Sequence, residues 1–106
     1  MLESKFQSNL IKEITRIFRG CVVLKNDANY IQGFPDLTIL YKDKWAVLEC
    51  KRSATASLQP NQEYYVDELD IMSFARVIYP ENKEEVLDEL QRIFTPGRTT
   101  RVSKSK

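Results

Sequence analysis

Apolar residues recur at helical spacing at both ends of the chain. Within residues 2–18 they fall on one face of a predicted amphipathic helix, which Gly20 ends: Phe6, Leu10, Ile14, Ile17 and Phe18. Near the C-terminus a second stripe predicts a last helix, which Pro96 and Gly97 end: Val86, Leu87, Leu90, Ile93 and Phe94. Asn82 stands where that helix should begin, and Glu85 three residues later completes an imperfect capping box.

Between these helices the pattern changes to short apolar runs rich in β-branched and aromatic residues, which are typical of strands. Residues 21–25 and 74–79 predict a first and a fourth strand. Residues 36–51 predict a hairpin with two mostly apolar faces, so the sheet should be covered on both sides. Pro60 suits the first turn of a middle helix, with three residues on one side: Tyr65, Leu69 and Met72. The order α-β-β-β-α-β-α implies an α/β fold around a central mixed sheet flanked by helices.

The predicted hairpin brings charged residues together at its open end. A two-residue turn at 42–43 pairs Tyr41 with Lys44, and the same register sets Asp36 directly opposite Glu49. Facing like charges destabilise a sheet, whereas a divalent cation held between them would reverse the sign of that energy. Lys51 follows Glu49 by two residues and therefore lies on the same face. Two carboxylates and an ammonium group at one end of a hairpin form a candidate active site.

Composition narrows the chemistry that this site can perform. The chain of 106 residues has no histidine, which excludes a His-ligated zinc and a Ser-His or Cys-His nucleophile. Cys21 and Cys50 lie in an apolar, strand-like context, which favours buried free thiols over a disulfide. The chain has no run of about 18 apolar residues and no signal-peptide h-region, so a cytoplasmic protein is expected.

Charge is distributed unevenly along the chain. The last twelve residues, 95–106, hold four of the 16 Lys and Arg residues and none of the 15 Asp and Glu residues. The predicted single domain, residues 1–94, is therefore acidic overall, and it is followed by a basic tail that is expected to be disordered. An acidic body argues against a nucleic-acid partner, but the basic tail and a clustered acidic metal site soften that objection.

Two segments carry a resemblance to a known family. The residues GFPD at 33–36, followed by ECK at 49–51, resemble the signature of the PD-(D/E)xK nucleases. From about Glu3 to Tyr79 the chain resembles the small phage and bacterial VRR-type nucleases, a group related to the Holliday-junction resolvases. Four further residues carry this similarity: Glu3, Gln7, Leu58 and Gln62. The resemblance implies a restriction-endonuclease-like αβββαβ core and a DNA endonuclease, possible substrates being a junction or a flap. A minimal chain of this kind suits a phage or a mobile element.

Hydrolysis of a phosphodiester needs an activated water and compensation of the negative charge in the transition state. Asp36 and Glu49 would bind one or two Mg²⁺ or Mn²⁺ ions for this purpose, because these hard cations prefer oxygen ligands. Lys51 would orient the water or stabilise charge on the phosphate. The resemblance adds three site residues: the Cys50 backbone carbonyl and Glu3 as metal ligands, and Gln62 as a contact to the phosphate or to the ligands.

Each of these residues also has an ordinary structural interpretation. Asp36 and Lys51 could be solvated strand ends, Glu3 is favoured by the dipole of its helix, and Gln62 could be a surface glutamine. The same fold also serves as an inactive DNA-binding or assembly subunit. The presence of both acids and the lysine argues against such a role here. A small-molecule phosphohydrolase would need a Gly-rich phosphate loop that this sequence lacks.

The expected partners are DNA and a second copy of the chain. Contacts to DNA are predicted for five residues, with ordinary solvation as the alternative for the first two: Lys25, Asn29, Arg52, Arg98 and Arg101. A homodimer would set two sites at a fixed spacing that matches the symmetry of a junction or duplex. Its predicted interface combines the last helix with residues 74–79, because three apolar side chains exceed what a small core covers: Tyr79, Ile93 and Phe94.

Overall fold

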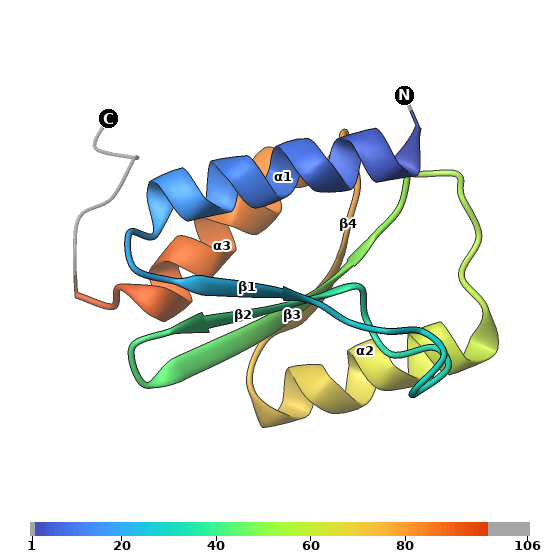
Figure 1. The fold of residues 1–106 in the computed structure, drawn as a ribbon. Coiled ribbons are helices and arrows are strands. Elements are labelled where there is room, and N and C mark those ends of the chain that lie inside the picture. Colours follow the sequence, from blue (N-terminus) through green and yellow to red (C-terminus); the bar gives the residue numbers. More distant parts are fainter. Residues whose placement is uncertain (1, 98–106) are drawn as a thin grey trace.

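The computed structural model describes residues 2–97 and places a four-stranded sheet between helices (Figure 1). Along the chain the elements are α1 (Glu3–Ile17), β1 (Val22–Lys25), β2 (Leu37–Tyr41), β3 (Lys44–Cys50), α2 (Pro60–Met72), β4 (Ala75–Ile78) and α3 (Lys83–Phe94). The strand order is β1-β2-β3-β4, antiparallel in the first two pairs and parallel between β3 and β4. The predicted α/β fold, with an αβββαβ core and a mixed sheet flanked by helices, is confirmed.

The register of the β2–β3 hairpin follows from its tight turn. Tyr41 pairs with Lys44 and Leu37 pairs with Leu48, as the two-residue loop requires. Lys42 accommodates the turn with a φ of 56°, in the left-handed region. One more step along this register sets Asp36 opposite Glu49, at the open end of the hairpin.

Two helices cover one face of the sheet and the third covers part of the other. Figure 1 shows α1 and α3 above the sheet and α2 below it. The larger core joins α1 and α3 to one face of the hairpin and includes these buried residues: Phe6, Leu10, Ile14, Phe18, Leu37, Ile39, Leu48, Leu87, Leu90 and Phe94. On the opposite face α2 packs over β3 and β4 through a smaller cluster: Val47, Leu69 and Ala75, with Phe34, Trp45, Tyr65 and Val66 at its margin.

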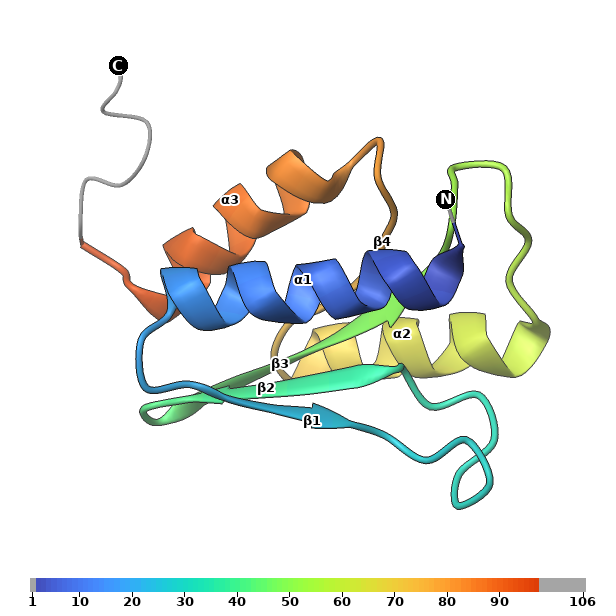
Figure 2. The same ribbon diagram turned by 45° about the horizontal axis from the view of Figure 1, so that its top comes forward.

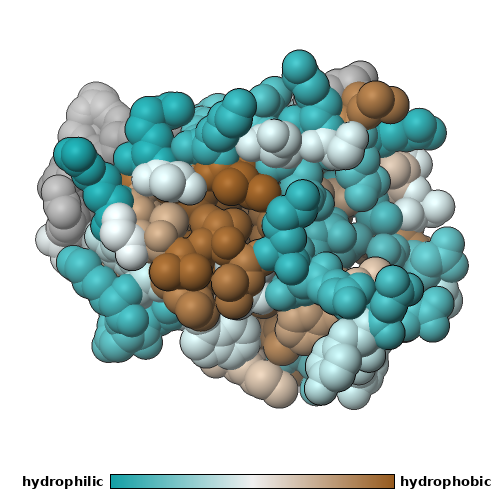
Figure 3. Space-filling view, viewed as in Figure 1, coloured by the Kyte–Doolittle hydropathy of each residue, from teal (hydrophilic) through white to brown (hydrophobic). Residues whose placement is uncertain are grey.

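Coverage of that second face is less complete than predicted. The outward side chains of β1 and β2 stay exposed, at 49% for Val22, 46% for Leu24 and 41% for Leu40, and apolar side chains gather at the surface there (Figure 3). Met72, expected on the buried side of α2, is 67% exposed. The reason is geometric, because one short helix spans only two of the four strands.

Two predictions at the C-terminal end need correction. Asn82 occupies the N-cap position of α3, as predicted, but the capping box does not form, because its amide oxygen accepts the Tyr79 N–H and its amide nitrogen donates to the Val77 carbonyl. Phe94 is no interface residue, since it is buried and its ring contacts Phe18 and Tyr41.

The structure bears on two further expectations, that the cysteines are buried free thiols and that no segment spans a membrane. Both cysteines are free thiols, but only Cys50 is buried, while Cys21 is partly exposed. Among residues 2–97 no helix is both long and apolar enough to cross a membrane. The basic tail beyond Gly97, with Arg98 and Arg101, lies outside the described residues.

Candidate active site

Asp36, directly before β2, is fixed by hydrogen bonds to β3 and to the residue that follows β1. The Cys50 N–H donates to Asp36 Oδ2 at 2.8 Å, and the Asn26 N–H donates to the Asp36 carbonyl at 2.8 Å. Burial raises the pKa of the Asp36 carboxyl and outweighs the opposite effects of the Cys50 amide and the Lys51 charge. The sheet therefore holds this carboxylate rigidly, in a position where it is partly removed from water.

Glu49 is the one buried polar side chain within the described residues, with 1% of its surface exposed. Its Oε2 accepts a hydrogen bond of 2.9 Å from Gln62 Nε2, whereas Oε1 has no partner among residues 2–97. Burial first, and then the negative charge of Asp36, raise the pKa of Glu49 to about 7, although Lys51 acts in the opposite direction. Glu49 therefore carries an unsatisfied oxygen and an unfavourable charge in the middle of the fold.

Lys51 and Gln62 complete the cluster from two different elements. Lys51 Nζ lies 3.7 Å from Glu49 Oε2 and donates to Gln62 Oε1 at 3.2 Å. Only 12% of the Lys51 side chain is exposed, so its charge is directed into the cluster. Gln62 consequently bridges the acid and the lysine, donating to one and accepting from the other.

The start of α2 positions Gln62. Gln59 and Gln62 form a reciprocal capping box, in which the Gln59 N–H donates to Gln62 Oε1 at 2.9 Å, and Pro60 occupies the first turn. The loop before β2 approaches this turn closely, because a Cβ added to Gly33 would lie 2.6 Å from Asn61 Cγ. A glycine with a φ of +90° is required at this contact.

Glu3 reaches the neighbourhood of the site from the other side of the sheet. Figures 1 and 2 both show the N-terminal end of α1 beside the C-terminal end of β3. After burial and the Asp36 carboxylate, the Glu3 charge adds to the raised pKa of Glu49. Glu3 is nevertheless exposed, and within residues 2–97 no three His, Cys, Asp or Glu side chains form a metal-binding group. Glu3 is therefore an outer neighbour of the two central carboxylates.

The predicted DNA-contacting residues are peripheral to this cluster. Lys25 is exposed at the end of β1, Asn29 is exposed in the following loop, and Arg52 is exposed next to Lys51. The Asn29 N–H donates to Asp27 Oδ1, so this contact serves the loop itself. Arg98 and Arg101 lie outside the described residues.

Asn26 belongs to the site and was not predicted. In addition to its backbone bond to Asp36, its Nδ2 donates to the Pro35 carbonyl at 2.8 Å and to Thr38 Oγ1 at 2.9 Å. These bonds fix the chain on both sides of Asp36. In the sequence, the only sign of this role is that Asn26 directly follows a β-rich run. The long loop 26–36 hides the register between the two strands, which would show that Asn26 lies beside Asp36.

The donor atoms of the cluster fit a hard divalent cation. Asp36 and Glu49 supply carboxylate oxygens, and Glu49 Oε1 is left with an unused lone pair. Mg²⁺ is commonly held by only one or two carboxylates and keeps several waters, so a two-carboxylate site is sufficient. The backbone carbonyl of Cys50 as a further ligand stays a prediction.

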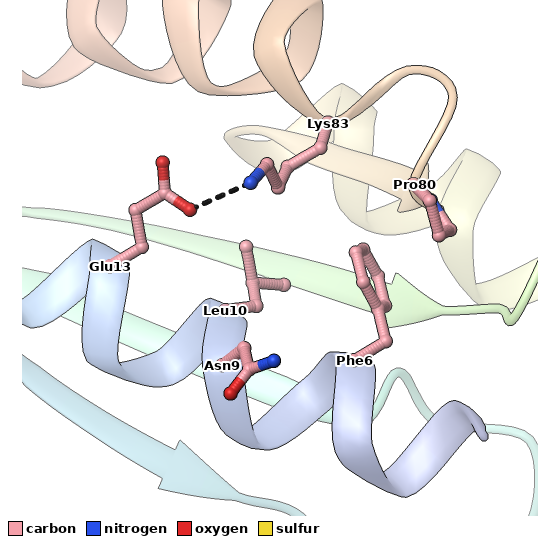
Figure 4. Close-up of a pocket in the computed structure, with 6 residues that line it drawn as sticks. All are labelled: Phe6, Asn9, Leu10, Glu13, Pro80 and Lys83. Carbon is pink, nitrogen blue, oxygen red and sulfur yellow. Dashed lines mark hydrogen bonds and ion pairs between the residues drawn. The ribbon is translucent and has the colours of Figure 1, made fainter. Parts of the chain in front are cut away.

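A separate hollow of about 130 Å³ lies between α1 and the turn before α3 (Figure 4). Phe6 and Leu10 form its apolar side, and Lys83 donates to Glu13 Oε1 across it at 2.9 Å. None of the predicted site residues lines this hollow. The ion pair ties α1 to α3, and we assign the hollow no chemistry.

No protein-family model, curated protein or solved structure matches the chain. The resemblance of the GFPD and ECK segments to the PD-(D/E)xK nucleases therefore stays a prediction from the sequence. The chemistry of the site lies in four residues: Asp36, Glu49, Lys51 and Gln62.

Proposed function

We propose that the protein is a metal-dependent endonuclease that hydrolyses phosphodiester bonds in DNA, with Mg²⁺ or Mn²⁺ held by Asp36 and Glu49. One observation carries this proposal: the Glu49 carboxylate is buried beside a second carboxylate, and its Oε1 has no partner within residues 2–97. Two carboxylates this close, one buried and one partly buried, are costly unless cations compensate them, and Lys51 supplies only one positive charge. A carboxylate pair that served only the fold would not need this arrangement.

The surrounding residues have roles that suit hydrolysis. The bound ion would lower the pKa of a coordinated water and polarise the phosphate. Lys51 would stabilise negative charge that develops on the phosphate or orient the attacking water. Gln62 holds Lys51 and Glu49 in one geometry before any substrate binds, which lowers the cost of assembling the site. Because both cysteines are free thiols, we also propose a cytoplasmic location, where thiols stay reduced.

A cleavage assay on labelled DNA tests this proposal. With Mg²⁺ or Mn²⁺ the wild type should cut, and a chelator should stop it. Asp36→Asn, which can still accept the Cys50 N–H, and Lys51→Ala should each lower the rate by on the order of a hundredfold or more. Asp67→Ala and Lys12→Ala remove exposed residues of the same types and should cut normally.

The result also separates the nuclease from the alternative of an inactive subunit. DNA binding without cleavage under any of these metal conditions would favour the inactive DNA-binding subunit. Cleavage that survives in both Asp36→Asn and Lys51→Ala would place the active site elsewhere.

A further inference from the structure

A hollow of about 530 Å³ opens beside the loop that joins β1 to β2. Its size falls in the range of roughly 300–1,000 Å³ that is typical of ligand pockets. Six residues line it: Asn26, Asp27, Tyr30, Ile31, Phe34 and Thr38. Tyr30 is 84% exposed, so its ring is accessible to a ligand in the hollow.

The hollow adjoins the candidate active site on the same face of the sheet. Thr38 follows Asp36 by two residues, so their side chains share a face at a separation of about 7 Å. Asn26 borders the hollow, and its backbone N–H donates to the Asp36 carbonyl. A nucleotide next to a phosphate held at Asp36 would therefore lie within reach of the hollow.

The walls of the hollow are held in place before any ligand binds. Phe34 contacts the Tyr65 ring of α2 at 5.6 Å between centroids, and Gly33 lies against Asn61. Within the loop, the Tyr30 N–H donates to the Asp27 carbonyl at 3.0 Å. Such a pocket requires little ordering on binding, which favours affinity.

The chemistry of the lining selects one part of a nucleotide. None of the six lining residues, all within the described part of the chain, is a lysine or arginine, and Asp27 is acidic. A phosphate would be repelled here, whereas the rings of Tyr30 and Phe34 and the Ile31 side chain suit a flat, uncharged ring. The hydrogen bonds of the Asn26 side chain use Nδ2, which leaves Oδ1 as an acceptor for the edge of a base.

We propose that this hollow receives an unpaired nucleobase of the DNA strand whose phosphate is held at Asp36 and Glu49. This inference rests on the proposed function and adds the substrate class. DNA with an unstacked nucleotide beside the scissile phosphate, in a single strand or a flap, is preferred over continuous duplex.

Binding of oligonucleotides that contain 2-aminopurine, whose fluorescence falls when it stacks on an aromatic ring, tests the proposal. Full-length Lys51→Ala protein with Mg²⁺ is used as the background, because it keeps both proposed metal ligands and cuts too slowly to consume the strand. Adding Tyr30→Ala should weaken binding of the single strand about 5- to 150-fold, the effect of losing one base–aromatic stack, and should abolish the quenching. Binding of the matched duplex should change less than about twofold.

Two control variants make the result specific. Tyr30→Phe keeps the ring and should bind like the parent. Tyr64→Ala removes another exposed ring, 58% exposed on α2, that does not line the hollow, and it should also bind like the parent. Equal losses on single strand and duplex for Tyr30→Ala, or a loss in Tyr30→Phe as large as in Tyr30→Ala, would overturn the base site. Equal competition by a free deoxynucleoside monophosphate would also overturn it, since the hollow would then serve a free nucleotide.

Cleavage by the wild type is measured separately, so failure of the two proposals can be distinguished. Tyr30-dependent quenching without any cleavage would support the base site and overturn the nuclease function. Metal-dependent cleavage with binding that is indifferent to Tyr30 would do the reverse.

Discussion

Replacing Glu49 by glutamine should stabilise the metal-free protein at alkaline pH and have little effect at acidic pH. Burial first, and then the Asp36 charge, raise the pKa of Glu49 from its ordinary value of 4.5 to about 7. The folded protein therefore holds this proton more tightly than the unfolded chain does. The resulting stabilisation is fully present below pH 4.5 and is lost as the pH rises through 7.

The size of the effect follows from the same pKa difference. At pH 9 this pKa difference lowers the free energy of unfolding of the wild type by roughly 3 kcal/mol. The glutamine side chain stays uncharged and its oxygen can still accept the Gln62 bond, but its buried amide group needs a new acceptor, which subtracts about 1 kcal/mol. A net gain of about 2 kcal/mol should raise the Tm by roughly 10 °C in a domain of this size.

Thermal unfolding followed by circular dichroism between pH 5 and pH 9, with a chelator present, measures this effect. The difference between Glu49→Gln and the wild type should be small at pH 5 and grow toward pH 9. Glu68→Gln, which neutralises an exposed carboxylate on the same protein, should stay within about 0.5 kcal/mol of the wild type at every pH. A difference that does not vary with pH, or a Glu49→Gln protein that is less stable at pH 9, would refute the reasoning.

Two further predictions concern the metal and assembly. Mg²⁺ should raise the Tm of the wild type but hardly that of Asp36→Asn, and an equal response of the two proteins would mean that the ion binds elsewhere. Without metal, Asp36→Asn should increase the free energy of unfolding by about 0.5–1 kcal/mol, because the repulsion between Asp36 and Glu49 is lost. A homodimer should give a mass of about 25 kDa in light scattering, twice the 12.4 kDa chain. Ile93→Glu, in the predicted interface on α3, where Ile93 is 42% exposed, should reduce that mass to one chain, and a dimer that persists in this variant would place the interface on another surface.

The parts of the fold that could be predicted from the sequence depend on short-range rules. A two-residue turn fixes the register of the β2–β3 hairpin, so the pairing of Leu37 with Leu48 followed from counting, and Asp36 and Glu49 are the next residues along each strand. Helical spacing gave α1 and α3 within one residue of their ends. In these cases each residue is positioned by neighbours that lie close in the chain.

The rest depends on contacts between distant segments. Asn26 joins the site only through the pairing of β1 with β2, which an eleven-residue loop conceals. Phe94 appeared to be surplus to a small core because its partners Phe18 and Tyr41 lie far away in the sequence. Asn82 occupies the predicted N-cap position of α3, but its side chain does not cap the helix, because the end of β4 offers it a donor and an acceptor.

Gln62 takes part in two structures at once, the first turn of α2 and the Lys51–Glu49 pair. Fraying of that turn would therefore also release the acid and the lysine, so the site can be no more persistent than the helix end. The backbone amide of Gln59, which is bound to Gln62 Oε1, becomes a reporter of this opening. Its rate of hydrogen exchange measures the fraction of molecules in which the site is disassembled, without any substrate being needed.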